Sequence, residues 1–249
     1  MFSLFTRAKE VYRGQGLNRL IRLGISFVYN YAYWMLFVRL RPSPGTFTFQ
    51  GRAYKYYYHW YNTTWRNERA VEVPVILEEV KLLREGRVLE VGNVLSHYVH
   101  FQHDIVDKDD KTIGVINQDV VDFQPDKKYD LIVSISTLEH VGYDEQPKEP
   151  EKSLIAINNL VEHALSPGGR MVVTFPLGYN TAMDRLLTEG KLRFTERFYL
   201  KRVSHRNDWV EVGWDEAKGA KYDAPFPSGN VIVCAIVELI PEFVSVPPA

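Results

Sequence analysis

Cysteine is almost absent from this sequence, and neither sign of charge predominates. Cys234 is the only cysteine in 249 residues, so no disulfide can form within the chain, as is typical of a reducing compartment. Thirty basic residues stand against thirty-one acidic ones, so the overall charge does not favour a nucleic-acid partner. We therefore expect a cytoplasmic protein that does not bind nucleic acid.

The sequence also lacks an apolar run of the length that a membrane-spanning helix needs. Residues 23–38 are uncharged but number only sixteen, whereas a span takes about twenty. Tyrosines and Trp34 lie within this run, and residues 1–41 hold seven basic residues against Glu10 alone, a net charge of about +6. A helix at an anionic membrane surface has this pattern, but so does a helix packed on a partner or on its own domain. We predict peripheral contact with the inner face of the membrane through residues 17–41, with the packed helix as the alternative.

Strand patterns alternate with helical ones along most of the chain, which predicts an α/β fold. Short apolar runs predict strands at 88–91, 104–107, 112–119, 129–136, 170–175, 198–212 and 230–240. Helical spacing is found at 74–84, 151–165 and 178–200, and a hairpin is expected at 46–58 around Gln50-Gly51. We expect a Rossmann-like, seven-stranded, mostly parallel sheet in residues 71–249. Residues 1–70 should form an N-terminal cap of an amphipathic helix and a hairpin.

Several expected strands end in residues that can bind a polar ligand. The first strand runs through Glu90 into Gly92, where a glycine lets the backbone approach a ligand closely. Asp107, Asp119 and Ser136 follow the next three strands. Because the carboxyl ends of parallel strands meet at one edge of a sheet, these groups should line a single crevice.

These segments resemble the class I S-adenosylmethionine-dependent methyltransferases over roughly residues 70–240. The likeness rests on V-L-E-V-G at 88–92, an acid at 107, Asp119, Y-D-L-I-V-S-I-S-T-L-E-H-V at 129–141 and L-S-P-G-G-R-M-V-V-T-F-P at 165–176. It implies S-adenosyl-L-methionine as the cofactor. The resemblance implies that Glu90 and Gly92 lie at its methionine end, Asp107 at the ribose hydroxyls, and Asp119 with Val120 at the adenine. Asn93 and Ser136 complete the expected cofactor site.

The residues expected at the acceptor lie after the fourth strand and in the aromatic-rich stretch 59–74. His140 is the titratable group best placed to take a proton near neutral pH, although a histidine that only caps a helix or packs on the cofactor fits as well. Trp60, Asn62 and Arg69, together with Glu139, offer the aromatic face and polar groups that a sugar requires. We predict O-methylation of a sugar or glycan precursor, as in methyltransferases of polysaccharide assembly. Trp60 and its neighbours could instead pack on the sheet domain.

Other functions stay open at this point. A lipid or quinone-like acceptor is one alternative. The other is a non-catalytic binding protein of the methyltransferase fold, because Val94 and Ser96 stand where the glycine-rich pattern has small residues. His97, His100 and His103 recur every three residues, but such a series drifts around a helix axis, so we predict no metal site.

Overall fold

The computed structural model describes residues 4–40 and 45–239, and the chain forms two compact units, Met1–Pro44 and Gly45–Ala249. Arg41 and Ile240, each at the end of an expected segment, lie outside the described residues. The unit boundary falls at Pro44, whereas the sequence pattern placed it after residue 70. The difference arises because the hairpin that follows Pro44 packs on the large sheet.

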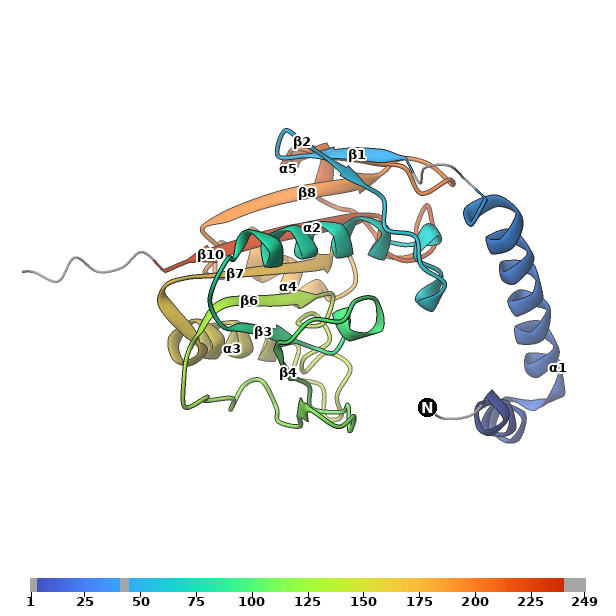
Figure 1. The fold of residues 1–249 in the computed structure, drawn as a ribbon, viewed down its shortest axis with the longest axis horizontal. Helices are drawn as coiled ribbons and strands as arrows, with labels where there is room; N and C mark the ends of the chain where they lie inside the picture. Colours follow the sequence, from blue (N-terminus) through green and yellow to red (C-terminus); the bar gives the residue numbers. More distant parts are fainter. Residues whose placement is uncertain (1–3, 41–44, 240–249) are drawn as a thin grey trace, which may run out of the picture. The chain divides into compact units, whose positions relative to one another are not determined.

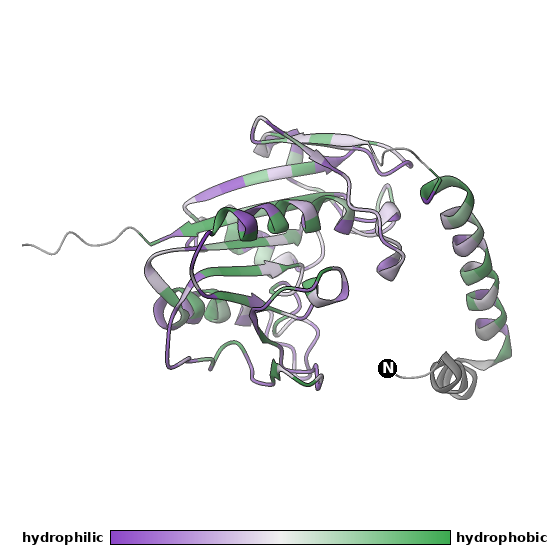
Figure 2. Cartoon of the chain, viewed as in Figure 1, coloured by the Kyte–Doolittle hydropathy of each residue, from purple (hydrophilic) through white to green (hydrophobic). Residues whose placement is uncertain are grey.

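The first unit is one helix, α1 (Leu4–Tyr33), which continues as the π-helical turn η1 (Trp34–Val38). Its aromatic rings stack four residues apart, with 6.4 Å between the centroids of Tyr29 and Tyr33 and 5.3 Å between those of Tyr33 and Phe37. Apolar residues recur along the helix (Figure 2). Ile25 and Val28 are each 65% exposed. In the part of the chain that the structure describes, no helix has both the length and the apolar character needed to cross a bilayer.

An eight-stranded sheet forms the second unit, in the order β5-β4-β3-β6-β7-β10-β8-β9 (Figure 1). Its strands are β3 (Val88–Val91), β4 (Asp104–Val106), β5 (Val115–Ile116), β6 (Tyr129–Ile135), β7 (Leu165–Pro176), β8 (Glu196–Arg202), β9 (Trp209–Val212) and β10 (Val231–Glu238). Pairing is parallel from β5 to β7, while β10 pairs antiparallel with β7 and β8, and β9 antiparallel with β8. The expected Rossmann-like α/β fold with a mostly parallel sheet is confirmed.

Several expected elements have different bounds, and the strand expected at 112–119 is only the two residues of β5. The single strand expected at 198–212 is a hairpin of β8 and β9, which gives eight strands rather than seven. Its turn includes Asn207 at φ 66°, a left-handed conformation that asparagine tolerates better than most residues. The helix expected at 178–200 is only α4 (Thr181–Thr188), capped by the Asn180 side chain, which accepts from the main-chain N–H groups of Ala182 and Met183.

Helix α2 (Arg69–Leu82) begins five residues before Pro74, where the sequence pattern placed its start. A proline inside a helix cannot donate to the carbonyl four residues earlier, here that of Ala70. Tyr57 supplies the missing donor, because its main-chain N–H lies 2.9 Å from the Ala70 oxygen. This contact lets the helix extend back to Arg69, which brings Arg69 and Glu72 to the site described below.

The expected hairpin near residue 50 is confirmed as β1 (Thr46–Phe49) and β2 (Arg52–Lys55). Both turn residues, Gln50 and Gly51, have positive φ, as a two-residue hairpin turn of type I′ requires. The Phe49 ring packs edge-on against Phe198, with 5.7 Å between centroids, and the Gln50 N–H donates to Glu211 at 2.7 Å. The hairpin is therefore part of the second unit.

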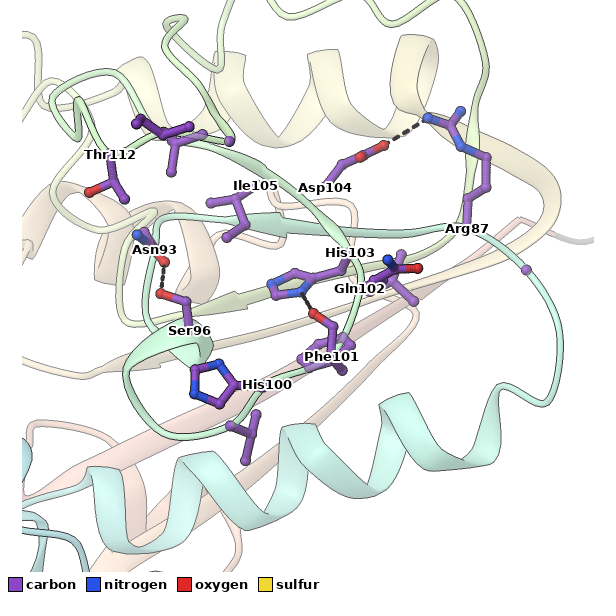
Figure 3. Close-up of a pocket in the computed structure, with 16 residues that line it drawn as sticks. Arg87, Asn93, Ser96, His100, Phe101, Gln102, His103, Asp104, Ile105 and Thr112 are labelled. Atoms are coloured by element: carbon purple, nitrogen blue, oxygen red, sulfur yellow. Dashed lines mark hydrogen bonds and ion pairs between the residues drawn. The ribbon is translucent and has the colours of Figure 1, made fainter.

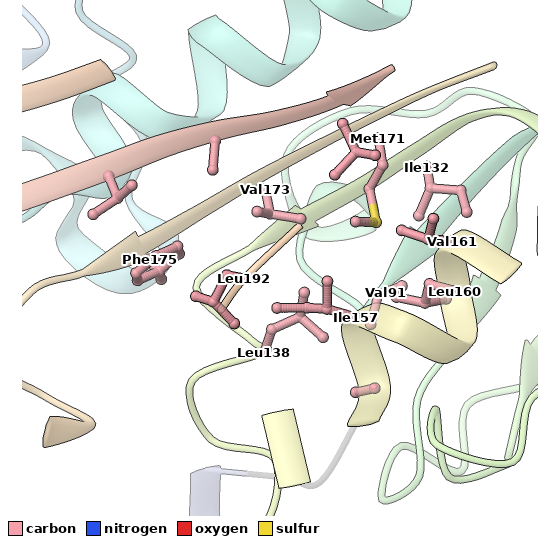
Figure 4. Packing of buried hydrophobic residues seen from close by; sticks show 14 of the residues in the cluster. Val91, Ile132, Leu138, Ile157, Leu160, Val161, Met171, Val173, Phe175 and Leu192 are labelled. Atoms are coloured by element: carbon pink, nitrogen blue, oxygen red, sulfur yellow. The ribbon is translucent and has the colours of Figure 1, made fainter. Parts of the chain in front are cut away.

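Buried apolar clusters cover both faces of the sheet. Residues of β6 alternate between them, with Ile132 in one cluster and Leu131 and Val133 in the other. The first cluster packs the sheet against α3 (Lys152–Asn159), the turn η4 (Leu160–Ala164) and α4 (Figure 4). The second packs it against α2 and the β1–β2 hairpin. Because both faces are covered, the carboxyl ends of the parallel strands are held in a fixed arrangement.

Candidate functional site

A cavity of about 360 Å³ lies at the carboxyl ends of β3, β4 and β6. We call it the strand-end cavity. It is lined by residues 91–92, 106–109, 118–120, 137, 140–141 and 144–145. Five residues that the sequence singled out lie here together, namely Gly92, Asp107, Asp119, Val120 and His140. Three others, Glu90, Asn93 and Ser136, do not line it.

Gly92 makes the turn from β3 into this cavity, with φ 83°. Its N–H donates to the Val106 carbonyl at 2.9 Å, which fixes the loop to β4. A Cβ at this position would lie 2.2 Å from Oγ1 of Thr137, far closer than real atoms approach. Only glycine fits here, because both the conformation and the space exclude a side chain.

Glu90 is buried and has all its partners inside the protein. Its Oε1 accepts from the N–H groups of Val94 (2.9 Å) and Leu95 (2.7 Å), at the start of the short turn η3 (Leu95–His97). Its Oε2 lies 2.7 Å from His103 Nε2, and the other ring nitrogen faces the Phe101 carbonyl at 3.1 Å. Burial is the largest single influence on the pKa of His103 and lowers it, but the Glu90 hydrogen bond and charge, the Phe101 carbonyl and Asp104 together raise the pKa overall. The acid that should face the cofactor instead organises the loop from within.

The turn after Gly92 has no need of a second glycine. Val94 has φ −107°, an ordinary conformation for a branched residue, and its N–H is bound by Glu90. Valine stands at position 94 where the family's glycine-rich pattern has a small residue, and it leaves the loop unstrained. It also means that the first N–H groups of η3 are not available to a ligand.

Asn93 points into a separate, open groove of about 870 Å³ that runs beside β4 and the edge strand β5 (Figure 3). Its amide donates to Asp110 at 2.6 Å and accepts from the Ser96 hydroxyl. His100 and His103 also line this groove. Among residues 4–40 and 45–239 there is no group of three or more His, Cys, Asp or Glu side chains placed to hold a metal ion.

Asp107 holds the loop after β4 and retains capacity for a ligand. Its Oδ1 accepts from the N–H groups of Asp109 and Asp110, both at 2.9 Å, and its Oδ2 from that of Asn93 at 3.2 Å. A carboxylate offers about four acceptor positions, so Oδ2 can take one further donor from the cavity. A ligand hydroxyl would meet that need.

Asp119 belongs to a four-membered ion-pair cluster, three members of which, Lys108, Asp119 and Glu145, line the strand-end cavity. Its Oδ2 lies 2.7 Å from Lys152 Nζ and 3.0 Å from Lys108 Nζ, and Glu145 pairs with the same two lysines at 2.8 and 3.1 Å. Burial raises the pKa of Asp119, but the lysines lower it more, and the net shift is downward. Sequence reasoning missed Lys108, Glu145 and Lys152, because their charges resemble ordinary loop charges.

His140 is held in a defined orientation. Its Nδ1 lies 2.5 Å from Oδ2 of Asp144, and the Tyr179 hydroxyl donates to the same oxygen at 2.7 Å. Burial is the largest single influence on the pKa of Asp144 and raises it, but these two hydrogen bonds and the charges of His140 and Lys148 together lower the pKa overall. The Asp144 carboxylate therefore favours the imidazole form that carries its proton on Nδ1, which leaves Nε2 as an acceptor. The Nε2 atom lies 3.9 Å from Glu139 Oε1.

A second cavity, of about 190 Å³, shares His140 with the first. We call it the acidic cavity. Its lining comprises Asn62, Asn67, Glu68, Arg69, Ser136, Glu139, His140, Pro176, Tyr179, Tyr222 and Ser228. It brings together three of the four residues expected at the acceptor, and it also includes Ser136. The fourth, Trp60, does not line it, and its ring stacks on Trp65 with 5.9 Å between centroids.

Helix α2 supplies the charges beside the acidic cavity. Arg69 pairs with Glu72, whose other oxygen accepts from the Ser136 hydroxyl at 2.6 Å. Glu68, which directly precedes Arg69, accepts from the Gly229 N–H at 3.1 Å. Sequence reasoning missed Glu68 and Glu72, although a spacing of four places them on one side of a helix that starts before Pro74.

Comparison with known proteins gives likenesses of structure alone. No protein-family model matches the sequence, and no curated protein matches it. The N-methyltransferase NodS from Bradyrhizobium japonicum, solved with S-adenosylhomocysteine, is 16% identical, covers 66% of this chain and 86% of its own, and gives a TM-score of 0.40. A 1,6-didemethyltoxoflavin N1-methyltransferase from Burkholderia thailandensis is 13% identical, covers 78% of this chain and 98% of its own, and gives a TM-score of 0.42. An rRNA methylase from Escherichia coli is 15% identical, covers 69% of this chain and 65% of its own, and gives a TM-score of 0.38.

Proposed function

We propose that this protein transfers a methyl group from S-adenosyl-L-methionine to a hydroxyl group of a sugar or glycan precursor. The cofactor would occupy the strand-end cavity and the acceptor the acidic cavity. The observation that supports this best is the position of His140, which lines both cavities. A ligand in one cavity can therefore meet a ligand in the other beside its imidazole ring.

The lining of the strand-end cavity suits the cofactor. Its volume of about 360 Å³ falls in the range of about 300–1,000 Å³ typical of small-molecule sites. Asp107 can accept a ribose hydroxyl, and Val106, Val120 and Val141 offer apolar surface for the adenine ring. An adenine amino group at Asp119 would share that carboxylate with Lys108 and Lys152.

His140 is the base in this proposal. S-adenosyl-L-methionine supplies a methyl group on a positively charged sulfur, and an acceptor hydroxyl loses one proton when it takes that group. Nε2 of His140 receives the proton, and Asp144 stabilises the imidazolium through its bond to Nδ1. Arg69 and Asn62 orient the acceptor, since correct placement supplies much of the rate in a direct transfer.

The lining also bears on the rival acceptors. Charged and amide side chains surround the acidic cavity, which gives a lipid or quinone-like ring little apolar surface. The chain beyond residue 41 carries a net charge of about −7, which does not favour nucleic acid. A small polar acceptor fits both facts.

Replacing Asp107 by alanine should weaken the binding of S-adenosyl-L-methionine by about 1–3 kcal/mol, the usual effect of leaving a buried donor unpaired. Isothermal titration calorimetry measures this directly. Asp107→Asn serves as a second variant, because its amide oxygen can still accept from the loop N–H groups. Asp126→Ala, on an exposed loop before β6, is the matched control. Unchanged affinity in both Asp107 variants would remove this residue from the site.

We also propose that residues 17–41 dock on an anionic membrane surface. Arg19, Arg22 and Arg39 flank exposed apolar side chains on α1 and η1, among them Leu36 at 61% and Phe37 at 57% exposure. Such a helix gains apolar burial together with attraction to acidic headgroups.

Neutralising two of these arginines, as Arg19→Gln/Arg22→Gln, should weaken partition onto anionic vesicles by about 2 kcal/mol, or roughly 30-fold. Flotation with phosphatidylserine vesicles at low and high salt measures the effect. Lys111→Gln/Lys127→Gln removes two exposed charges from the second unit and should change nothing. Equal recovery of the wild type with and without anionic lipid would contradict membrane docking and favour the packed helix.

A further inference from the structure

Glu139 is a fully buried carboxyl group that points into the acidic cavity with both oxygens unused. It is 1% exposed, and neither oxygen has a hydrogen-bond partner among the residues that the structure describes. The nearest basic atom, Nε2 of His140, lies 3.9 Å from Oε1, too far for a hydrogen bond. Buried polar groups almost always have partners, so this one indicates a ligand.

The charges around Glu139 are already committed elsewhere. The Arg69 guanidinium pairs with Glu72, and Glu72 also accepts from Ser136. Glu68 accepts from a main-chain N–H and adds a third carboxyl group beside the single guanidinium. Burial raises the pKa of Glu139 well above its ordinary value, and the Glu72 charge raises it further. The cavity is therefore short of positive charge.

A protonated amine would supply both what the Glu139 oxygens lack, hydrogen-bond donors, and what the cavity lacks, a positive charge. It brings one positive charge, and its three N–H donors can satisfy both oxygens of Glu139. The rest of the lining, including Asn62, Tyr179 and Tyr222, offers amide and hydroxyl groups that suit ring hydroxyls.

We infer that the acidic cavity binds an amino sugar, with its ammonium group on the Glu139 carboxylate. This inference deepens the proposed function and rests on it for the role of the cavity. The ammonium group anchors the acceptor, and Glu139 thereby selects an amino sugar over its neutral counterpart.

Calorimetric titration with glucosamine and glucose tests the inference, because the two share a ring and differ at one group. With S-adenosylhomocysteine present, the wild type should bind glucosamine about 10- to 100-fold more tightly than glucose, as expected for a hydrogen bond to a charged group. Glu139→Gln keeps the size and polarity of the side chain but removes the charge, so the preference should disappear. Glu162→Gln, on an exposed turn, should retain it.

Equal affinity of the wild type for the two sugars would overturn the inference, and so would failure to bind either of them. A preference that survives Glu139→Gln would do the same, because Glu139 would then not hold the amine. The wild-type comparison needs no variant and is decisive even if Glu139→Gln does not fold. A separate titration with S-adenosyl-L-methionine tests the proposed function. Cofactor binding without a preference for glucosamine would contradict only the amine site. A preference for glucosamine without cofactor binding would contradict only the proposed methyl transfer.

Discussion

His140→Ala should lower the rate of methyl transfer by about 10²–10⁴-fold, the usual contribution of a general base, with cofactor affinity nearly unchanged. The imidazole lies where the two cavities meet, and Asp144 fixes its orientation, so Nε2 is placed to take the proton of an acceptor hydroxyl. Release of S-adenosylhomocysteine measures turnover with a panel of monosaccharides and nucleotide sugars. Calorimetry with S-adenosyl-L-methionine measures affinity separately.

Two further variants separate a base from a residue that only positions the acceptor. His163→Ala removes an exposed histidine just before β7, at the opposite end of the strand from the site, and should leave turnover unchanged. Asp144→Asn should cause a smaller loss of turnover than His140→Ala, because the imidazole stays in the site but loses its carboxylate partner. If His140 only orients the acceptor, its loss would appear mainly in KM. Unchanged turnover in His140→Ala would remove it from the mechanism.

Strand ends were the part of the site that the sequence could predict. Short apolar runs that end in Gly92, Asp107 or Asp119 have one plausible place in a parallel sheet, and the structure brings these residues together. Strand spacing and direction are set by local sequence pattern, so the positions of the strand ends follow from it. Burial on both faces then fixes the arrangement. Glu90 and Ser136 were expected in the same crevice but do not line the cavity.

Side-chain partners were the part that it could not predict. Glu90 and Asn93 lie within two residues of Gly92 in sequence, yet their side chains bind the loop and its neighbours rather than facing the cavity. Such choices depend on which N–H groups remain unpaired after folding, and residue order does not contain that information. The pairing of Asp119 with Lys152 joins residues 33 positions apart for the same reason.

Two errors in element bounds also have physical causes. Pro74 normally marks the start of a helix, but the Tyr57 N–H occupies the carbonyl that the proline leaves free, and the helix runs on toward Arg69. One strand was expected at 198–212, but residues 204–208 form a turn in which Asn207 allows the chain to reverse. Both cases involve a tertiary contact or a single unusual backbone angle that overrides the local pattern.

Gly92→Ala should destabilise the protein by about 2–5 kcal/mol and remove cofactor binding. One part of this loss is backbone strain, about 1–2 kcal/mol for an L residue in the left-handed region, since φ is 83°. The larger part is overpacking, because the new methyl group would lie 2.2 Å from Oγ1 and 2.6 Å from Cγ2 of Thr137. The Gly92 N–H is tied to Val106, so the loop cannot move aside without losing that hydrogen bond.

Gly51→Ala provides the matched control for this variant, because Gly51 has φ 70° but no atom lies within 4 Å of the place that its new methyl group would take. It should therefore show the strain alone, about 1–2 kcal/mol in urea unfolding. The double variant Gly92→Ala/Thr137→Ala removes two of the three close contacts and should recover part of the lost stability, with the 2.9 Å contact to the Thr137 Cβ remaining. If Gly92→Ala unfolds no more easily than Gly51→Ala, the fit of the loop against Thr137 is not what requires a glycine there. Cofactor binding by Gly92→Ala would further show that the loop after β3 can take another path without loss of the strand-end cavity.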